Sequence, residues 1–311
     1  MMADIVVSEF MDKTIVEQDL SGYNVLFDPG LVDKPEELLA ELADARALIV
    51  RNRTQVNVKL LAAAPKLEVV GRLGVGLDNI DLEACKARGI PVYPATGAND
   101  LAVAEYVITA TMMLLRNAFM DSEAVARGAW PRERMIGSET RGKRLGLIGL
   151  GANARTTAGI AAALGMQVAA YDPYLSADAA CWREVERLDL NALLESSDVV
   201  SIHVPLTRET HHLIDATALE RIKSGAILIN AARGGIVDET AMLHALRKGR
   251  LLGAALDVFE SEPLTSSESS RFEGIPNLIL TPHIAGVTKE SNVRVSRVTV
   301  NNVLQHLNSR H

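Results

Sequence analysis

The sequence predicts an α/β protein built on parallel β-sheets. Short apolar runs alternate with segments of helical periodicity along nearly the whole chain. These runs lack the alternating pattern of a half-exposed strand, so helices should cover both faces of the sheets. One run, residues 145–148, breaks into Gly149-Leu-Gly151 and is followed by an alanine-rich helical segment, which is typical of a strand, a tight turn and a helix.

The first hundred residues contain apolar strand candidates separated by helical or glycine-rich segments. Strands are predicted at residues 5–7, 23–27, 47–50, 67–70 and 90–93, and helices at 12–20 and 33–43. Asp33 is the expected N-cap of the second helix, with Pro35 in its first turn. Two of the strands end at polar or glycine-rich loops that begin at Arg51 and Gly71. The carboxyl ends of parallel strands form the ligand-binding edge of such sheets.

Residues 100–115 form a long, largely apolar helical pattern in which Glu105 is the one acidic residue after Asp100. A helix this apolar should be buried all round, either between domains or at a subunit interface. Residues 121–134, with Trp130-Pro131, would then reach towards a neighbouring subunit. We therefore expect a homodimer.

The second half continues the alternation of strands and helices. Helices are predicted at residues 158–164, 188–194, 216–222, 238–248 and 289–307, and strands at 145–148, 167–171, 198–202, 226–230, 253–256 and 278–280. Residues 264–271 are rich in Ser and Glu and are expected to form a flexible loop.

The glycine turn predicts a dinucleotide site. Gly149 permits the tight turn, Gly151 lets the backbone approach a pyrophosphate, and Ala154 allows close packing of helix on strand. The next strand ends at Asp172, where a carboxylate would bind the adenosine ribose. No Lys or Arg follows before Arg183 to neutralise a 2′-phosphate, so NAD is preferred over NADP. An ordinary tight turn is the alternative.

Composition excludes several other classes. The net charge of −7, without any Lys/Arg-rich run, argues against a nucleic-acid surface. No apolar run is long enough to cross a bilayer, and the N-terminus has no secretory signal pattern, so a cytoplasmic location is expected. Cys85 and Cys181 form neither a disulfide framework nor a metal-binding pattern, and no metal is expected.

Three predicted strand ends carry Arg233, Glu262 and His283 beside Gly or Pro. Each alone is more often structural or solvated, but strand ends of one sheet converge on one crevice. A nicotinamide there can deliver hydride to a carbonyl carbon, whose oxygen must then gain a proton. His283 suits that proton transfer, Glu262 would orient the imidazole and favour its charged form, and Arg233 could pair with a substrate carboxylate.

Four motifs together resemble the D-isomer-specific 2-hydroxyacid dehydrogenases, in particular the phosphoglycerate dehydrogenase-like branch. The motifs are Gly149-Leu-Gly151, Asn230-Ala-Ala-Arg233-Gly-Gly, Asp257-Val-Phe-Glu-Ser-Glu262-Pro and Thr281-Pro-His283-Ile-Ala-Gly. The resemblance implies an NAD-dependent 2-hydroxyacid dehydrogenase with Arg233, Glu262 and His283 as its catalytic triad. It also implies two Rossmann-like domains joined by a hinge: a discontinuous substrate domain, 1–98 with 285–311, and an NAD-binding domain, 99–284.

The resemblance extends to further residues. It implies that the backbone of Val75 and Gly76 holds the substrate carboxylate, that Asp257 contacts the nicotinamide carboxamide and that Thr207 lies by the nucleotide. The full set of expected cofactor-binding residues is Gly149, Gly151, Ala152, Asn153, Asp172, His203, Pro205, Thr207, Ala231, Arg233, Asp257 and His283. Residues 152–154 read Ala-Asn-Ala where relatives carry Arg-Ile-Gly, which spares only the backbone contacts to the pyrophosphate.

Arg51, Arg53 and the nearby Arg72 suggest a second cationic pocket, although the first two could also belong to a solvated loop. They resemble arginines that receive a distal phosphate in phosphoglycerate dehydrogenases. The expected substrate is a C3 acid with an anionic tail, either 3-phosphoglycerate or 3-sulfolactate. Glyoxylate, hydroxypyruvate or D-lactate are the alternatives, and an NAD(H)-sensing corepressor-like binding protein is the alternative from a different class.

Overall fold

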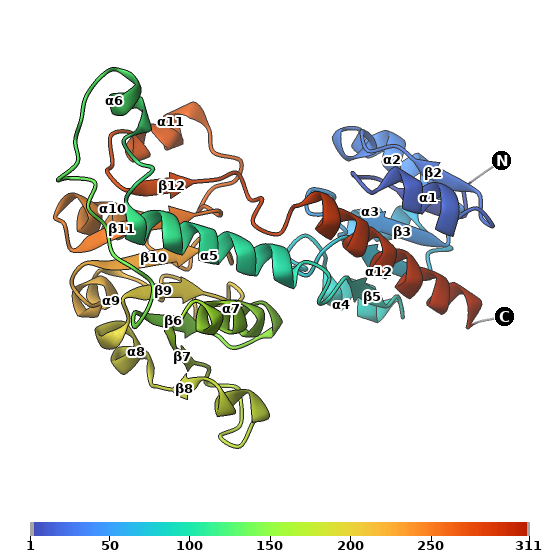
Figure 1. Cartoon of the computed structure of the whole chain (residues 1–311). Coiled ribbons are helices and arrows are strands. Elements are labelled where there is room, and N and C mark those ends of the chain that lie inside the picture. The colour runs from blue at the N-terminus through green and yellow to red at the C-terminus, as the bar shows by residue number, and fades with distance from the viewer. Residues whose placement is uncertain (1–2, 310–311) are drawn as a thin grey trace. The chain divides into compact units, whose positions relative to one another are not determined.

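The computed structural model describes residues 3–309, which form two compact units (Figure 1). Unit 1 contains the described residues up to Asn99 and those from Val287 onward, and unit 2 is Asp100–Gly286. Each unit is built on its own parallel sheet flanked by helices. The predicted α/β class is therefore confirmed.

Unit 1 has a five-stranded sheet in the order β2-β1-β3-β4-β5. Its strands are β1 (Ile5–Val7), β2 (Val25–Phe27), β3 (Ala47–Val50), β4 (Val69–Arg72) and β5 (Val92–Pro94). Its helices are α1 (Lys13–Asp19), η1 (Leu31–Asp33), α2 (Pro35–Glu41), α3 (Val58–Ala63), α4 (Leu82–Ala87) and α12 (Lys289–Asn308). The register pairs Val7 with Ile49 and Val50 with Arg72, so the loops after β1, β3 and β4 emerge from the same edge.

The C-terminal helix α12 packs on β4 although its first residue, Lys289, lies 217 positions after Arg72, the last residue of that strand. Gly71 in β4 explains this contact, because a Cβ there would lie 2.7 Å from Val303 and 2.9 Å from Thr299. The missing side chain lets the helix approach the strand closely. In Figure 1, α12 runs beside α1 in the same unit.

Unit 2 has a seven-stranded sheet in the order β12-β11-β10-β9-β6-β7-β8. Its strands are β6 (Arg144–Ile148), β7 (Gln167–Tyr171), β8 (Glu186–Arg187), β9 (Val199–Ile202), β10 (Ala226–Asn230), β11 (Leu251–Leu256) and β12 (Leu278–Leu280). Its helices are α5 (Asp100–Arg116), α6 (Ser122–Ala126), α7 (Ala152–Ala163), η2 (Ala180–Arg183), α8 (Leu190–Ser196), α9 (Ala216–Arg221), α10 (Glu239–Arg247), α11 (Ser266–Ser269) and η3 (Ser270–Phe272). Every strand pair is parallel.

Within this chain, helix α5 is buried along one side, and burial of its other side at a subunit interface stays a prediction. One side packs against α7, β10 and β11, where Val107 and Leu114 are buried. Leu101 and Met112 are exposed. The segment that follows contains the short helix α6, and Trp130 beyond it is 78% exposed.

Two local predictions were wrong. Residues 264–271 are not a simple flexible loop, because Thr265 and Glu268 form a reciprocal capping box that starts α11. Asp33 does not cap the following helix; α2 begins after Lys34, which makes no side-chain cap. The Asp33 carboxylate instead forms an ion pair with Arg53. Within residues 3–309, no helix has the length and apolar character needed to cross a membrane.

Candidate active site

The sheet order of unit 2 brings three predicted functional loops together. β10, β11 and β12 are neighbours in the sheet, and their carboxyl ends lead to Arg233, Glu262 and His283 respectively. Because the strands are parallel, the three loops leave the sheet at one edge. Residues that are 50 positions apart in sequence thus belong to one site.

His283 and Glu262 are in direct contact. Nδ1 of His283 lies 2.7 Å from Oε2 of Glu262, and the other carboxylate oxygen accepts a hydrogen bond of 2.9 Å from the N–H of Phe259. Burial by itself would raise the pKa of Glu262, but these hydrogen bonds and the charges of His283 and Arg233 outweigh it and lower the pKa. Glu262 is therefore ionised at neutral pH and orients the imidazole.

A buried carboxylate shapes the loop that carries His283. Asp257, 1% exposed, accepts hydrogen bonds from the Thr281 hydroxyl at 2.6 Å and from the N–H groups of Ile284 at 2.8 Å and Ala285 at 2.7 Å. These hydrogen bonds fix the loop around Asp257 and hold His283 at a backbone φ of +55°. A left-handed backbone at a non-glycine residue persists only where the surroundings enforce it.

Tyr106 of α5 supports the same loop. Its hydroxyl lies 2.7 Å from Oγ1 of Thr281, which in turn donates to Asp257. Burial raises the pKa of Tyr106 to about 12, so its hydroxyl remains a neutral hydrogen-bonding group. The long helix is thereby linked to the loop that presents His283.

The loop carrying Arg233 is fixed by its neighbours. Asn230 donates from Nδ2 to the carbonyl of Arg233 at 2.8 Å and accepts from the N–H of Ala232 at 3.1 Å. A Cβ at Gly234 would lie 1.7 Å from the carbonyl oxygen of Phe259. Only glycine permits this close approach, which places the Arg233 loop against the loop that carries Glu262.

The glycine turn has the geometry of an anion-binding helix start. Gly149 has a φ of +90°, and a Cβ there would lie 2.7 Å from the carbonyl oxygen of His203. Gly151 is the N-cap of α7, faces open space and provides no side-chain cap to the helix. The unpaired N–H groups of the first turn thus suit a pyrophosphate. Asp172 accepts from the N–H of Leu150 at 2.9 Å, which ties the end of β7 to this turn.

The other expected cofactor residues lie in the loops around this turn. His203 follows β9, its Nε2 lies 2.9 Å from the Ser201 hydroxyl, and burial lowers its pKa to about 4, so the ring is neutral. Thr207 accepts from the N–H groups of Glu209 and Thr210 at 3.2 and 3.3 Å. The remaining residues are Ala152 and Asn153 in the first turn of α7, Pro205 in the loop after β9 and Ala231 in the loop after β10.

In unit 1 the two arginines after β3 differ. Arg53 is exposed and its guanidinium is paired with Asp33. Arg51 is half-buried, with its guanidinium 5.7 Å from the ring centroid of Phe10 and its Nη2 3.3 Å from Oδ1 of Asn292. Burial lowers the pKa of Arg51, and the carboxylate of Glu9 partly opposes this effect.

Arg72 is the last residue of the neighbouring strand, β4, and the glycine loop follows it. Nη1 of Arg72 donates to the carbonyl of Leu73 at 2.8 Å and occupies the space where Gly74 would carry a Cβ. Val75 is 39% exposed, and neither its N–H nor that of Gly76 donates to another residue of the described part of the chain. These two backbone donors are therefore available to a carboxylate.

The structure thus groups the predicted site residues into two sets, one in each unit. Sequence reasoning missed two residues of the unit 1 set, Glu9 and Asn79, which are 4% and 7% exposed. Their signals in the sequence were weak: Glu9 is an acidic residue two positions after a buried strand, and Asn79 is an amide inside a glycine-rich segment.

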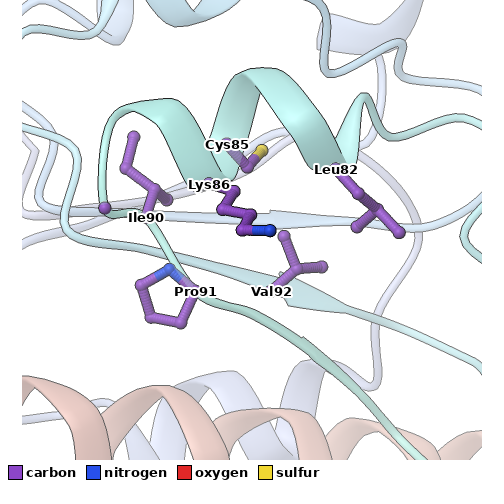
Figure 2. A pocket seen from close by; sticks show the side chains of 7 residues that line it. Leu82, Cys85, Lys86, Ile90, Pro91 and Val92 are labelled. Atoms are coloured by element: carbon purple, nitrogen blue, oxygen red, sulfur yellow. The ribbon is translucent and has the colours of Figure 1, made fainter.

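A shallow pocket of about 400 Å³ in unit 1 is separate from these sets (Figure 2). It is lined by α4 and by Gly89–Val92, at the amino end of β5. Ligands of parallel sheets bind at the carboxyl ends of strands, so its position does not suit the reaction centre. Among residues 3–309, no group of three or more His, Cys, Asp or Glu side chains could hold a metal ion.

Comparisons with known proteins place these features in context. Residues 108–285 match the NAD-binding domain of the D-isomer specific 2-hydroxyacid dehydrogenases. The chain is 53% identical over 310 residues to (S)-sulfolactate dehydrogenase of Chromohalobacter salexigens, covering 99% of this chain and 100% of that protein. It is 40% identical to D-3-phosphoglycerate dehydrogenase of Archaeoglobus fulgidus, covering 97% of this chain and 57% of that protein.

Among solved structures, D-lactate dehydrogenase of Aquifex aeolicus, complexed with NAD and lactic acid, superposes with a TM-score of 0.84. The sequence identity is 28%, and the match covers 98% of this chain and 95% of the other.

Proposed function

This chain belongs to the D-isomer specific 2-hydroxyacid dehydrogenase family, and we propose from that membership that its substrate is a three-carbon 2-hydroxy acid with an anionic tail. The reaction class is that of the family: the chain is an NAD-dependent oxidoreductase that interconverts a 2-hydroxy acid and its 2-oxo acid. NAD, held at the first turn of α7 and by Asp172, would supply the hydride acceptor for oxidation and, in its reduced form, the hydride donor for reduction. The observation that carries the catalytic part of the proposal is the 2.7 Å contact between His283 and Glu262.

We propose that His283 moves the proton at the substrate oxygen. Glu262 engages Nδ1, which leaves Nε2 for the substrate. During oxidation the neutral imidazole removes the hydroxyl proton, and during reduction the imidazolium donates a proton to the carbonyl oxygen. Arg233 pairs with the substrate carboxylate and polarises the adjacent carbonyl.

The two units are proposed to bind different ligands. Unit 2 is proposed as the NAD-binding domain, with the first turn of α7 at the pyrophosphate, Asp172 at the ribose and Asp257 beside the nicotinamide. Unit 1 is proposed as the substrate domain, in which Val75 and Gly76 donate N–H groups to the substrate carboxylate. The chain segments 99–100 and 286–287, where the units meet in sequence, are proposed as the hinge.

The tail is proposed to bind Arg51 and to be a sulfonate rather than a phosphate. A sulfonate carries one negative charge, whereas a phosphate monoester carries about −1.5 to −2 at pH 7. Arg53 is paired with Asp33, whereas the half-buried Arg51 is held by Asn292, and Arg51 is proposed as the cation for the tail. The similarity to (S)-sulfolactate dehydrogenase supports the same choice.

Stereochemistry is consistent with one binding mode for these acids. In sulfolactate the sulfur-bearing carbon outranks the carboxylate in the rules that assign R and S, whereas in phosphoglycerate and lactate the carboxylate outranks the third carbon. The (S) form of sulfolactate therefore has the same spatial arrangement as the D forms of the other two acids. A D-specific site accepts all three with hydride leaving from one face.

A panel of 2-oxo acids tests the proposed function directly. NADH oxidation is measured with sulfopyruvate, phosphohydroxypyruvate, hydroxypyruvate, glyoxylate and pyruvate at pH 7. We expect the highest kcat/KM for sulfopyruvate, followed by phosphohydroxypyruvate. A preference for glyoxylate or pyruvate would replace the tail-bearing substrate with a simple acid, and NADH binding without turnover of any acid would favour a nucleotide-sensing protein.

Separate substitutions of the two arginines test the tail site. We expect Arg51→Ala to lower kcat/KM for 3-sulfolactate by about tenfold or more, because it removes a charge-assisted contact, and to leave D-lactate oxidation nearly unchanged. Arg53→Ala is the matched control, because its exposed ion pair with Asp33 contributes little. Equal losses on both acids in Arg51→Ala would contradict the tail contact.

Replacing Glu262 by Gln is expected to lower kcat. The lowered pKa of Glu262 means that its carboxylate is charged at neutral pH and can orient the imidazole of His283, which it contacts at 2.7 Å. Without that charged partner the imidazole is held less well for proton transfer, so kcat at neutral pH should fall by about 10²-fold in both directions. An unchanged kcat with a lower Tm would assign Glu262 a structural role.

A homodimer and a cytoplasmic location complete the proposal. Trp130 and Ile136, 78% and 75% exposed, lie in the segment after α5 and suit a contact with a second copy. No nucleic-acid partner is proposed, because the chain has a net charge of −7. Sedimentation of the purified protein measures its oligomeric state.

A further inference from the structure

The loop after β3, residues 51–54, is bound by a buried carboxylate from the segment that follows the neighbouring strand, β1. Oε1 of Glu9 accepts hydrogen bonds of 2.9 Å from the N–H groups of both Arg51 and Thr54. Oε2 accepts from the N–H groups of Asn52 at 3.3 Å and Arg53 at 3.1 Å. All four N–H groups of the loop thus converge on one side chain that is 4% exposed.

Asn79 holds the carbonyl groups of the same loop. Its Nδ2 donates to the carbonyl of Thr54 at 2.7 Å and to that of Arg51 at 3.4 Å. Its own carbonyl accepts from the N–H of Val56 at 2.9 Å. Because Asn79 follows Val75 and Gly76 in the glycine loop, it couples this loop to residues 51–54.

The Arg51 side chain is oriented by residues that adjoin this network. Its guanidinium lies over the ring of Phe10, which directly follows Glu9, and contacts Asn292 of α12. Backbone and side chain are therefore both restrained. A side chain with many rotatable bonds gains binding specificity when such contacts hold it in advance.

We propose that Glu9 and Asn79 are positioning residues that hold Arg51 at a set separation from the N–H groups of Val75 and Gly76. This proposal rests on the proposed function, in which Arg51 binds the anionic tail and the glycine loop binds the carboxylate. The carboxylate and the anionic tail of a three-carbon acid then both bind to one hydrogen-bonded assembly within unit 1. Selectivity for tail-bearing acids depends on Glu9 and Asn79, although neither needs to touch the substrate.

The chemistry of Glu9 supports a role beyond packing. Burying a carboxylate is costly unless it is fully hydrogen-bonded. Its hydrogen-bonding partners are N–H groups of one short loop, and Ser8 and Thr54 add a hydroxyl contact of 2.9 Å beside it. A loop whose donors converge on a single anion has its backbone orientation set by that anion.

Glu9→Gln and Asn79→Leu test the proposal without adding charge. In the first variant the amide NH₂ competes with the loop N–H groups, and in the second the carbonyl of Thr54 loses its donor. The kinetics of NAD-dependent oxidation are measured with 3-sulfolactate and with D-lactate, and Tm is recorded in parallel. We expect the ratio of kcat/KM for 3-sulfolactate to that for D-lactate to fall by about tenfold, mainly through KM.

Glu68→Gln is the matched control. It makes the same chemical change in unit 1, where Glu68 is half-buried and paired with Arg46 at 2.6 Å, but at the amino end of β4. The ratio should stay at the wild-type value. Equal losses on both acids in Glu9→Gln and Asn79→Leu, or an unchanged ratio, would overturn the positioning role. A wild-type enzyme that does not prefer 3-sulfolactate over D-lactate would instead count against the proposed substrate.

Discussion

His283→Ala is expected to lower kcat by about 10³-fold while leaving the Kd for NADH within about twofold of wild type. The proposed proton transfer depends on the imidazole, whereas the glycine turn and Asp172 that are proposed for NAD lie on other strands of unit 2. Stopped-flow turnover gives kcat, and equilibrium fluorescence titration gives the NADH Kd.

The exposed His244 on α10 provides the control for this experiment. His244→Ala should leave both kcat and NADH binding unchanged. A comparable loss of turnover and of NADH binding in His283→Ala would mean that the ring supports the fold of the loop instead of moving a proton. Partial rescue of turnover by added imidazole would strengthen the proton-transfer role.

Arg233→Lys is expected to lower kcat/KM by about 10²-fold or more, although the positive charge is kept. The guanidinium presents parallel N–H donors that match a carboxylate, whereas an ammonium group is a point charge. Asn230 and Gly234 fix the backbone of this loop, so a lysine cannot adjust its position freely. Steady-state kinetics with the preferred 2-oxo acid measure the effect.

The exposed Arg221 on α9 offers a matched control, because it has an ion pair of 3.9 Å with Glu195. Arg221→Lys should have wild-type kinetics. If Arg233→Lys also had wild-type kcat/KM, bidentate recognition of the carboxylate would be excluded. A loss of NADH affinity that equals the loss of kcat/KM would place Arg233 at the cofactor alone.

Much of the fold could be predicted because its signals are local. Buried parallel strands appear as short apolar runs, and Gly149 and Gly151 mark the start of a helix by their position after such a run. The residue types at the ends of β10, β11 and β12 also indicated the reaction class, which the family comparison confirms. The helix start was placed too late, at residue 158 instead of Ala152, because alanine and asparagine give a weak start signal.

The two local errors have different causes. Asp33 has the residue type of an N-cap, but its carboxylate pairs with Arg53. Residues 264–271 have a loop-like composition, yet the capping box of Thr265 and Glu268 stabilises a helical turn. The amino-acid composition of a segment shows which residue types are present, but it does not show which residues they contact.

The sequence by itself determined the α/β class, the glycine turn and the three ionisable residues that follow neighbouring strands. Only the tertiary structure decided that Arg51 is held by Phe10 and Asn292 while Arg53 is paired with Asp33. Such differences depend on contacts between side chains that are 20 residues apart in sequence for Arg53 and Asp33 and 241 apart for Arg51 and Asn292. No local sequence pattern predicts these contacts. The residue types can be identified from the sequence, but the geometry of the site follows from which strands are neighbours in the sheet.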